Sequence, residues 1–181
     1  HSLTLILSKK YNPLFDSKAR YFIITGGRGS GKSFAVTVFL TLLTMSRGIR
    51  VLFTRFTMTS AHLSIIPEFL EKIGLLGFEE TFNINKAEVV NAENKSDILF
   101  RGIRTSAGNQ TASLKSLQGI STWVLDEAEE LVDENIFDTI DLSIREKNIQ
   151  NRVILILNPV TKEHWIYKRF FEDKGVEGGF N

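Results

Sequence analysis

The sequence has no cysteine and only three prolines among its 181 residues. The lack of cysteine excludes a disulfide framework and any cysteine-ligated zinc site, and it agrees with a reducing compartment. No apolar run approaches the roughly 20 residues that span a bilayer. The opening segment, HSLTLILSKK, is too short and wrongly flanked for a secretory signal. We therefore expect a soluble, intracellular protein that makes no contact with membranes.

Neither sign of charge dominates, since 22 basic residues stand against 21 acidic ones. Domains that bind nucleic acid through their overall charge are strongly basic. Any contact with DNA or RNA must therefore come from a local patch. Hydrophobic residues make up 43% of the chain, which is enough to bury one core. We expect residues 1–181 to form a single domain.

Short apolar segments alternate with helical ones along the chain. The expected strands are Tyr21–Thr25, Ile49–Thr54, Thr122–Glu127 and Asn151–Pro159. A helix over Lys32–Ser46 is apolar on nearly every side, which is typical of a buried helix, and Gly48 is placed to end it. This alternation predicts an α/β fold whose mostly parallel sheet is covered on both faces. Sites in such folds lie at the carboxyl ends of the strands.

The segments between these elements are less regular. A helical region runs through Ile73, with Pro67 either in the first turn of a helix or breaking a longer one. Residues 82–102 alternate with a period of two and predict a meander of short strands. Residues 102–121 are rich in small polar side chains and predict a mobile loop.

The segment ITGGRGSGKSF contains the complete Walker A pattern, with a strand before it and a helix after it. Its glycines let backbone N–H groups point at phosphates, and the helix start adds a positive dipole end. Lys32 is expected to reach the β- and γ-phosphates, and the Ser33 hydroxyl to ligate Mg²⁺. The expected nucleotide-binding residues of this segment are Gly26, Gly27, Arg28, Gly29, Ser30, Gly31, Lys32, Ser33 and Phe34.

An apolar strand ends on two acids, Asp126 and Glu127. At a strand tip beside a phosphate loop, Asp126 is expected to hold Mg²⁺ through its hydration shell. Glu127 is placed to orient or deprotonate an attacking water, which favours hydrolysis over nucleotide storage. The alternative is that acids in this region only stabilise a helix N-terminus. That explanation suits the acids that follow: Glu129, Glu130, Asp133 and Glu134.

The last strongly apolar strand ends on Asn158, and Pro159 follows it. A polar side chain at this place is able to lie beside the γ-phosphate or the lytic water and sense hydrolysis. Asn-Pro is equally an ordinary start of a turn. The spacing alone leaves both explanations open.

Six segments in a fixed order carry a resemblance to a known family. They are YNPLF (11–15), GGRGSGKS (26–33), ILFRGIR (98–104), LKSLQGISTWVLDEAEEL (114–131), LSIRE (142–146) and LILNP (155–159). Together they resemble the large subunit of tailed-phage terminases, more narrowly the prophage type, over almost the whole chain. The resemblance implies an additional-strand, RecA-like P-loop NTPase, an α/β three-layer sandwich with a mainly parallel central sheet.

The same resemblance implies a function. The protein is expected to hydrolyse ATP with Mg²⁺ and to drive double-stranded viral DNA into a procapsid, in the cytoplasm of the infected bacterial host. Its expected partners are the DNA, the portal protein and the small terminase subunit, with a homo-oligomeric ring on the portal and a monomer in isolation. Terminases of this kind carry a nuclease domain after the ATPase. We therefore expect residues 1–181 to be the ATPase part of a longer chain, without nuclease activity.

Roles for individual residues also follow from the resemblance. Glu127 becomes the catalytic glutamate, Asp126 the magnesium carboxylate and Asn158 the coupling residue. Lys32 and Arg28 join the catalytic group. Three residues of the YNPLF segment are candidates for contact with adenine, although an N-terminal turn packed on the core explains them equally: Tyr11, Asn12 and Phe15.

Basic residues supply the remaining candidates. Arg28 is expected either to neutralise the γ-phosphate in its own subunit or to face a neighbour in a ring. Further candidates for an arginine finger, with plain surface exposure as the alternative, are Arg101, Arg104 and Arg145. Candidate DNA contacts are Lys86, Lys95 and Lys115. The segment HWIYKRFF (164–171) is better explained as a helix that buries its apolar residues and leaves Lys168 and Arg169 solvated.

Two other functions remain open at this stage. One is a helicase-like or partition-like DNA-dependent ATPase, although no helicase motif for contact with single strands is found. The other is a nucleotide-binding module that assembles with little turnover.

Overall fold

The computed structural model of the protein describes residues 11–26, 31–58 and 61–172. Within these residues, seven strands form one sheet in the order β1-β9-β8-β2-β5-β4-β3. The bounds of the strands are β1 Tyr21–Thr25, β2 Arg50–Arg55, β3 Phe82–Ile84, β4 Glu88–Asn91, β5 Asp97–Gly102, β8 Thr122–Asp126 and β9 Arg152–Leu157. From β1 to β5 the neighbours in this order are parallel, whereas β4 and β3 are antiparallel at one edge. The mostly parallel sheet expected from the sequence is confirmed.

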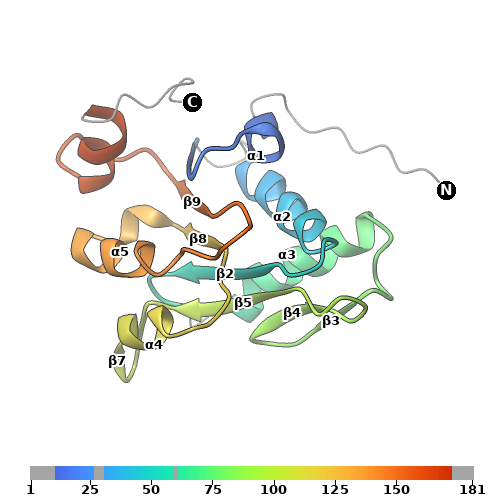
Figure 1. Cartoon of the computed structure of the whole chain (residues 1–181). Helices are drawn as coiled ribbons and strands as arrows, with labels where there is room; N and C mark the ends of the chain where they lie inside the picture. The colour runs from blue at the N-terminus through green and yellow to red at the C-terminus, as the bar shows by residue number, and fades with distance from the viewer. Residues whose placement is uncertain (1–10, 27–30, 59–60, 173–181) are drawn as a thin grey trace.

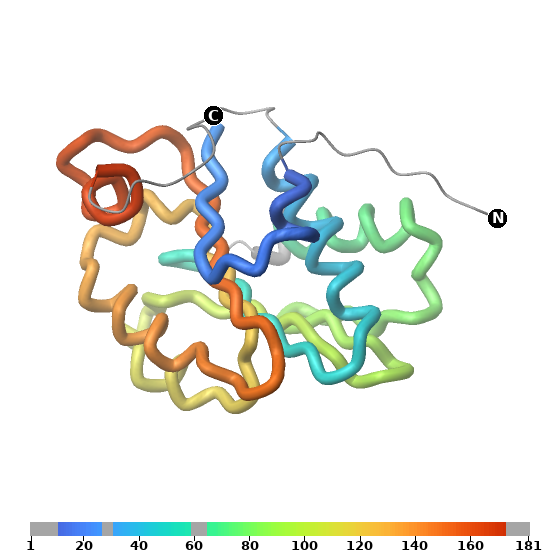
Figure 2. The backbone as a smooth tube through the Cα atoms, turned by 45° about the horizontal axis from the view of Figure 1, so that its top comes forward, coloured from blue at the N-terminus to red at the C-terminus, as the bar shows by residue number. Residues whose placement is uncertain are grey.

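Strand β9 lies between β1, which precedes the phosphate loop, and β8, which ends on the acids. It pairs in register with both strands, so that Ile156 lies beside Ile24 on one side and Asp126 on the other. Figure 2 shows the chain segments of β1 and β9 side by side although they are far apart in the sequence. This inserted strand is the feature that defines the additional-strand arrangement predicted above.

Helices cover both faces of the sheet (Figure 1). One face carries α1 (Asn12–Asp16), α2 (Lys32–Leu43) and α3 (Ala61–Leu75), and the other carries α4 (Thr111–Lys115), α5 (Glu134–Asp141) and the C-terminal π-helix η3 (Tyr167–Glu172). Side chains of β8 alternate between the two cores. Val124 packs in the α2 and α3 core, whereas Trp123 lies 5.1 Å, ring to ring, from Phe137 of α5. The protein therefore has the three layers that were expected.

Two irregular segments differ from the sequence-based expectation. Pro67 lies inside α3, neither in its first turn nor at a break. Proline removes a helix hydrogen bond, but Ile65 and Phe69 on either side of it are buried in the core and hold the helix together. Residues 102–121 form a hairpin of β6 (Arg104–Thr105) and β7 (Gly108–Asn109), followed by α4, in place of a loop. Leu114 of α4 is buried and anchors this segment.

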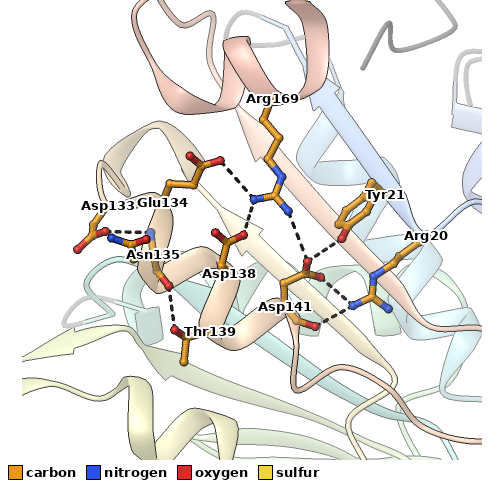
Figure 3. Close-up of polar contacts among 9 residues, drawn as sticks. All are labelled: Arg20, Tyr21, Asp133, Glu134, Asn135, Asp138, Thr139, Asp141 and Arg169. Atoms are coloured by element: carbon orange, nitrogen blue, oxygen red, sulfur yellow. Dashed lines mark hydrogen bonds and ion pairs between the residues drawn. The ribbon is translucent and has the colours of Figure 1, made fainter. Parts of the chain in front are cut away.

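Asp141, at the end of α5, connects three elements through its carboxylate (Figure 3). Oδ2 accepts a hydrogen bond of 2.6 Å from the Tyr21 hydroxyl of β1, and Oδ1 accepts one of 2.7 Å from Arg20. Burial and the hydrogen bond to Asp141 both raise the pKa of Tyr21. The base of β1 is thus tied to α5.

Arg169 of η3 reaches the same cluster from the C-terminal side. It forms ion pairs with Glu134 at 3.3 Å, with Asp138, and with Asp141 at 3.8 Å (Figure 3). Burial opposes the charge, but the hydrogen bonds to Asp138 and Glu134 outweigh it and raise the pKa of Arg169. The sequence predicted a solvated Arg169, and this was wrong because the acids of α5 face it. The predicted burial of Trp165, Ile166 and Phe170 is confirmed. No helix in the described part of the chain is long and apolar enough to cross a bilayer.

Candidate nucleotide site

Four neighbouring parallel strands end at one edge of the sheet, and each ends on or just before a polar residue. β1 ends on Thr25, just before Gly26 of the phosphate loop, and β9 ends just before Asn158. β8 ends on Asp126, and β2 ends on Arg55. Because the strands are parallel and in register, their carboxyl ends meet at this edge. The described residues of the three predicted motifs are therefore brought together at this edge.

Lys32 is the first residue of α2 and points to the end of β9. Its Nζ donates hydrogen bonds to the Gly26 carbonyl at 2.5 Å and to Asn158 Oδ1 at 3.0 Å. Gly31 precedes the helix with a φ of 82°, a left-handed conformation that favours glycine and turns the chain from the loop into the helix. The Walker A lysine and the residue that ends β9 are thus in direct contact.

Ser33 follows Lys32 and faces α3. Its hydroxyl lies 2.8 and 2.9 Å from the two carboxylate oxygens of Glu68. Hydroxyl and carboxylate oxygens are ligands that Mg²⁺ accepts, and the helix start places them beside the phosphate loop. Ser33 therefore fits the metal role that the motif predicts.

Asp126 is nearly buried and is held by an arginine from the next strand. Arg55 donates to Oδ2 from Nε at 2.8 Å, and its Nη2 lies 2.8 Å from the same oxygen. Oδ1 accepts the backbone N–H of Glu127 at 3.0 Å. A carboxylate has about four acceptor sites, so Oδ1 keeps capacity for a metal-bound water. This donor chemistry also fits Mg²⁺.

Glu127 differs from Asp126 in having an exposed side chain. Its backbone is left-handed, with φ 51° and ψ 47°, which turns the chain sharply after β8. Its Oε1 lies 3.9 Å from Nη1 of Arg55. Asp126 is therefore held by close partners, while the Glu127 carboxylate at the strand tip is exposed and is in reach only of Arg55 among the ion pairs of the described residues.

Within the described residues, no group of three or more His, Cys, Asp or Glu side chains is arranged to hold a metal ion alone. Mg²⁺ at nucleotide sites is commonly bound by one or two carboxylates and the substrate phosphates, and keeps several waters. The separate oxygen donors of Ser33 and Asp126 match that mode of binding.

Comparison with known proteins decides the family. The model of the phage terminase large subunit family matches residues 18–178. The chain belongs to this family. A search of curated proteins found no match.

Three solved structures show the same fold. The large terminase of a thermophilic bacteriophage has a TM-score of 0.73 at 11% identity, covering 93% of this chain and 43% of that one. The ATPase domain of the Thermus phage P74-26 large terminase has a TM-score of 0.68 at 20% identity, covering 97% and 73%. The N-terminal domain of the bacteriophage phi29 DNA packaging ATPase has a TM-score of 0.68 at 18% identity, covering 96% and 92%.

These neighbours confirm the P-loop NTPase fold of the terminase ATPase domains. The chain spans less than half of the length of the first of these terminases. That terminase has also been solved in complexes with ADP and with ATP-gamma-S.

Of the three residues predicted to contact adenine, only Tyr11 lies close to the start of α2. Tyr11 is buried, and its hydroxyl lies 4.0 Å from the position of a β-carbon on Gly31. Asn12 is exposed, and the half-exposed ring of Phe15 lies edge-on to Phe39, 5.1 Å away. Of the three, Tyr11 is thus placed beside the phosphate loop and Phe15 beside the body of α2. Phe34 is turned toward α3, where its ring lies 4.7 Å from Lys72 Nζ.

The candidate arginines that the structure describes lie near opposite ends of the parallel strands. Gly27, Arg28, Gly29 and Ser30 lie outside the described residues. Arg101 is the penultimate residue of β5 and donates hydrogen bonds to the carbonyls of Phe100 and Ala87. Arg104 follows β5 and is exposed on β6. Arg145 is exposed between α5 and β9, in the segment that leads to the amino end of β9. The candidate DNA contacts Lys86, Lys95 and Lys115 are exposed.

Three residues of the site were not recognised in the sequence. Arg55 holds Asp126, Glu68 holds Ser33, and Glu129 bonds Asn158 through its carboxylate. Arg55 directly follows the predicted strand Ile49–Thr54, so the rule that sites lie at the carboxyl ends of strands was sufficient to find it. The sequence explained Glu129 as a helix N-terminal charge. It does lie in the first turn of a 3₁₀ helix over Ala128–Glu130, as Asp133 and Glu134 do at the start of α5, but its bond to Asn158 was missed.

Proposed function

We propose that this terminase chain is the ATP-hydrolysing motor domain that drives double-stranded DNA into a procapsid. The observation that carries the proposal is the contact between Lys32 and Asn158. It lies at the edge of the sheet where β8 ends on Asp126 and is followed by Glu127. A phosphate-binding lysine and a carboxylate able to act on water thus share one edge. The neighbour solved with ADP and with ATP-gamma-S supports an adenine nucleotide as the ligand.

Binding is assigned to the phosphate loop and α2. Lys32 Nζ is held by the Gly26 carbonyl and Asn158. When nucleotide binds, this ammonium group turns to the β- and γ-phosphates and offsets their negative charge. Backbone N–H groups at the start of α2 face the phosphates, and the dipole of this helix favours their negative charge. The Tyr11 hydroxyl lies beside Gly31, where the phosphate loop passes into α2.

Ser33 and Asp126 are the residues that would hold Mg²⁺, which when bound neutralises charge developing on the phosphate oxygens. Glu127 orients the attacking water and accepts its proton. Its exposed carboxylate at a sharp turn gives it the freedom to reach that water, while Arg55 keeps the neighbouring Asp126 in place. Asn158 reports the state of the γ-phosphate through its contact with Lys32.

The assembled motor would supply an arginine from a neighbouring subunit. Membership of the terminase family supports work within a DNA-packaging assembly, and the phi29 viral genome packaging motor assembly has a chain of the same fold, with a TM-score of 0.64. We propose that this assembly is a ring on the portal that works with a small subunit in the host cytoplasm. We propose Arg28 as the arginine acting on the γ-phosphate, with Arg101, Arg104 and Arg145 as candidates donated by a neighbour. Residues 1–181 would make up this ATPase unit, and DNA cleavage would belong to another domain.

The experiment that tests the motor assignment measures ATP turnover with double-stranded DNA and the portal protein. The wild-type chain is expected to be slow alone and faster in the assembly, because an arginine in trans is absent from the monomer. Arg28→Ala is the variant expected to lose this stimulation. If no assembly stimulates turnover but single-stranded DNA does, a helicase-like ATPase is correct; if nothing stimulates it, the nucleotide-binding module is correct.

A further inference from the structure

The geometry points to Glu129 as a positioning residue that fixes the direction of the Asn158 side chain. The Glu129 carboxylate accepts two hydrogen bonds from this one residue, at 3.2 Å from the backbone N–H and at 3.1 Å from Nδ2. On the other side of the amide, Oδ1 accepts from Lys32 Nζ at 3.0 Å. This inference rests on the proposed function, because it gives Asn158 a part in the hydrolysis cycle.

The chemistry of the two partners allows only one orientation of the amide. An ammonium group has donors and no acceptor, and an ionised carboxylate has acceptors and no donor. Asn158 must therefore present its oxygen to Lys32 and its nitrogen to Glu129. An amide turned by 180° would place donor against donor and acceptor against acceptor. Glu129 thus selects the orientation that the lysine contact requires.

The turn that carries Glu129 is held in place by burial and by hydrogen bonds to its backbone. Residues 128–130 form the 3₁₀ turn η2, whose first residue, Ala128, is fully buried. The Glu129 carbonyl accepts from His164 Nε2 at 3.0 Å, since His164 Nδ1 accepts the Ile166 N–H at 3.1 Å and leaves the proton on Nε2. Trp165 Nε1 donates to the carbonyl of Leu131, two residues further on, at 2.7 Å. A side chain on such a supported turn is able to orient another one.

The position of Glu129 predicts which kinetic constant it controls. The described contacts of its side chain are to Asn158 alone, and it stands two residues after Glu127 on the same turn. When Lys32 turns to the phosphates, Asn158 loses that contact, and only Glu129 keeps its amide in place. Removing Glu129 should therefore slow hydrolysis while leaving nucleotide binding unchanged.

The first test observes the Asn158 side chain directly and needs no turnover. In ¹H–¹⁵N spectra of this chain, the Nδ2 resonances of Asn158 are identified by their loss in Asn158→Ala. Glu129→Gln is expected to displace them, because a glutamine oxygen accepts only one of the two bonds that the carboxylate now accepts. Glu130→Gln, an exposed neighbour on the same turn, is the matched control and should leave them in place. Unmoved resonances in Glu129→Gln would overturn the inference.

The second test is steady-state kinetics of ATP hydrolysis. We expect Glu129→Gln to lower kcat by about tenfold, the effect of one hydrogen bond to a charged group, with KM changed less than about twofold. Glu129→Gln added to Asn158→Ala should cost nothing further, because a residue that acts through another has no effect once that other is removed. Additive losses, or a KM that rises with kcat unchanged, would show that Glu129 acts otherwise. If wild type has no turnover, the proposed function fails while the spectra still decide the contact.

Discussion

Arg55 and Asp126, 71 residues apart in the chain, form a buried ion pair at the ends of neighbouring strands. Nε and Nη2 of the arginine both lie 2.8 Å from the same carboxylate oxygen. The side chains are only 19% and 12% exposed, so little water is available to replace either partner. The carboxylate proposed to hold Mg²⁺ is thus fixed in place before any ligand arrives.

Removing Arg55 should destabilise the fold through Asp126. Arg55→Ala leaves a largely buried carboxylate without its donor, so the free energy of unfolding is expected to fall by about 2 kcal/mol. Urea unfolding measures this loss. In an Asp126→Asn background the same substitution should cost clearly less, because the charge that Arg55 compensates is gone. Equal losses in both backgrounds would mean that Arg55 stabilises the protein by other contacts.

Arg169 is expected to hold the C-terminal helix on α5. Its guanidinium pairs with three carboxylates and lies 4.9 Å from the Phe137 ring centroid. Arg169→Met keeps much of the apolar stem but removes the charge, and should lower the free energy of unfolding by about 1–3 kcal/mol. The exposed neighbour Lys168 gives the control, since Lys168→Met should change it by less than about 0.5 kcal/mol. Similar effects of the two substitutions would contradict the network of Figure 3.

Thr54 links β2 to β8 through its side chain. The hydroxyl donates to the Val124 carbonyl at 2.9 Å and accepts from Trp123 Nε1 at 2.9 Å, with the residue fully buried. Thr54→Val keeps the shape but leaves the indole N–H without an acceptor, which should cost about 1–3 kcal/mol of stability. The exposed Thr57 is the control: Thr57→Val should be nearly neutral. Thermal or urea unfolding of both variants decides the matter.

Tyr21 should make stability depend on pH at the alkaline end. Burial and the hydrogen bond to Asp141 raise its pKa, so above about pH 10 the folded chain retains a proton that the unfolded chain releases. Unfolding is then favoured as pH rises. The difference in unfolding free energy between wild type and Tyr21→Phe is expected to be constant at lower pH and to shrink above this point. A difference that does not change with pH would contradict the raised pKa.

The strands and their motifs were predictable because each is a local pattern. Tyr21–Thr25 was placed with its observed bounds, and the buried character of α2 followed from apolar residues on every side. Pro67 misled the prediction because its effect was judged from local propensity, whereas packing on both sides decides the helix. Local propensity does not predict an element whose stability depends on tertiary packing.

The partners within the site were not predictable for the same reason. Ser33 and Glu68 are 35 residues apart, and Asn158 and Glu129 are 29 apart. Nothing in the spacing of such pairs shows that they meet until the order of the strands is known. Because β8 and β9 are parallel neighbours, both end at the same edge of the sheet, and there Glu129 of the turn after β8 meets Asn158.

The most direct test of the central claim compares nucleotide binding with hydrolysis in Glu127→Gln. This variant keeps the size of the side chain and removes its ability to accept a proton from water. Binding is measured with a fluorescent ATP analogue and turnover by release of inorganic phosphate, with exposed Glu130→Gln as the control. The account predicts unchanged binding, turnover reduced by about 10²-fold or more, and a control like wild type. Turnover equal to that of wild type in Glu127→Gln would contradict it.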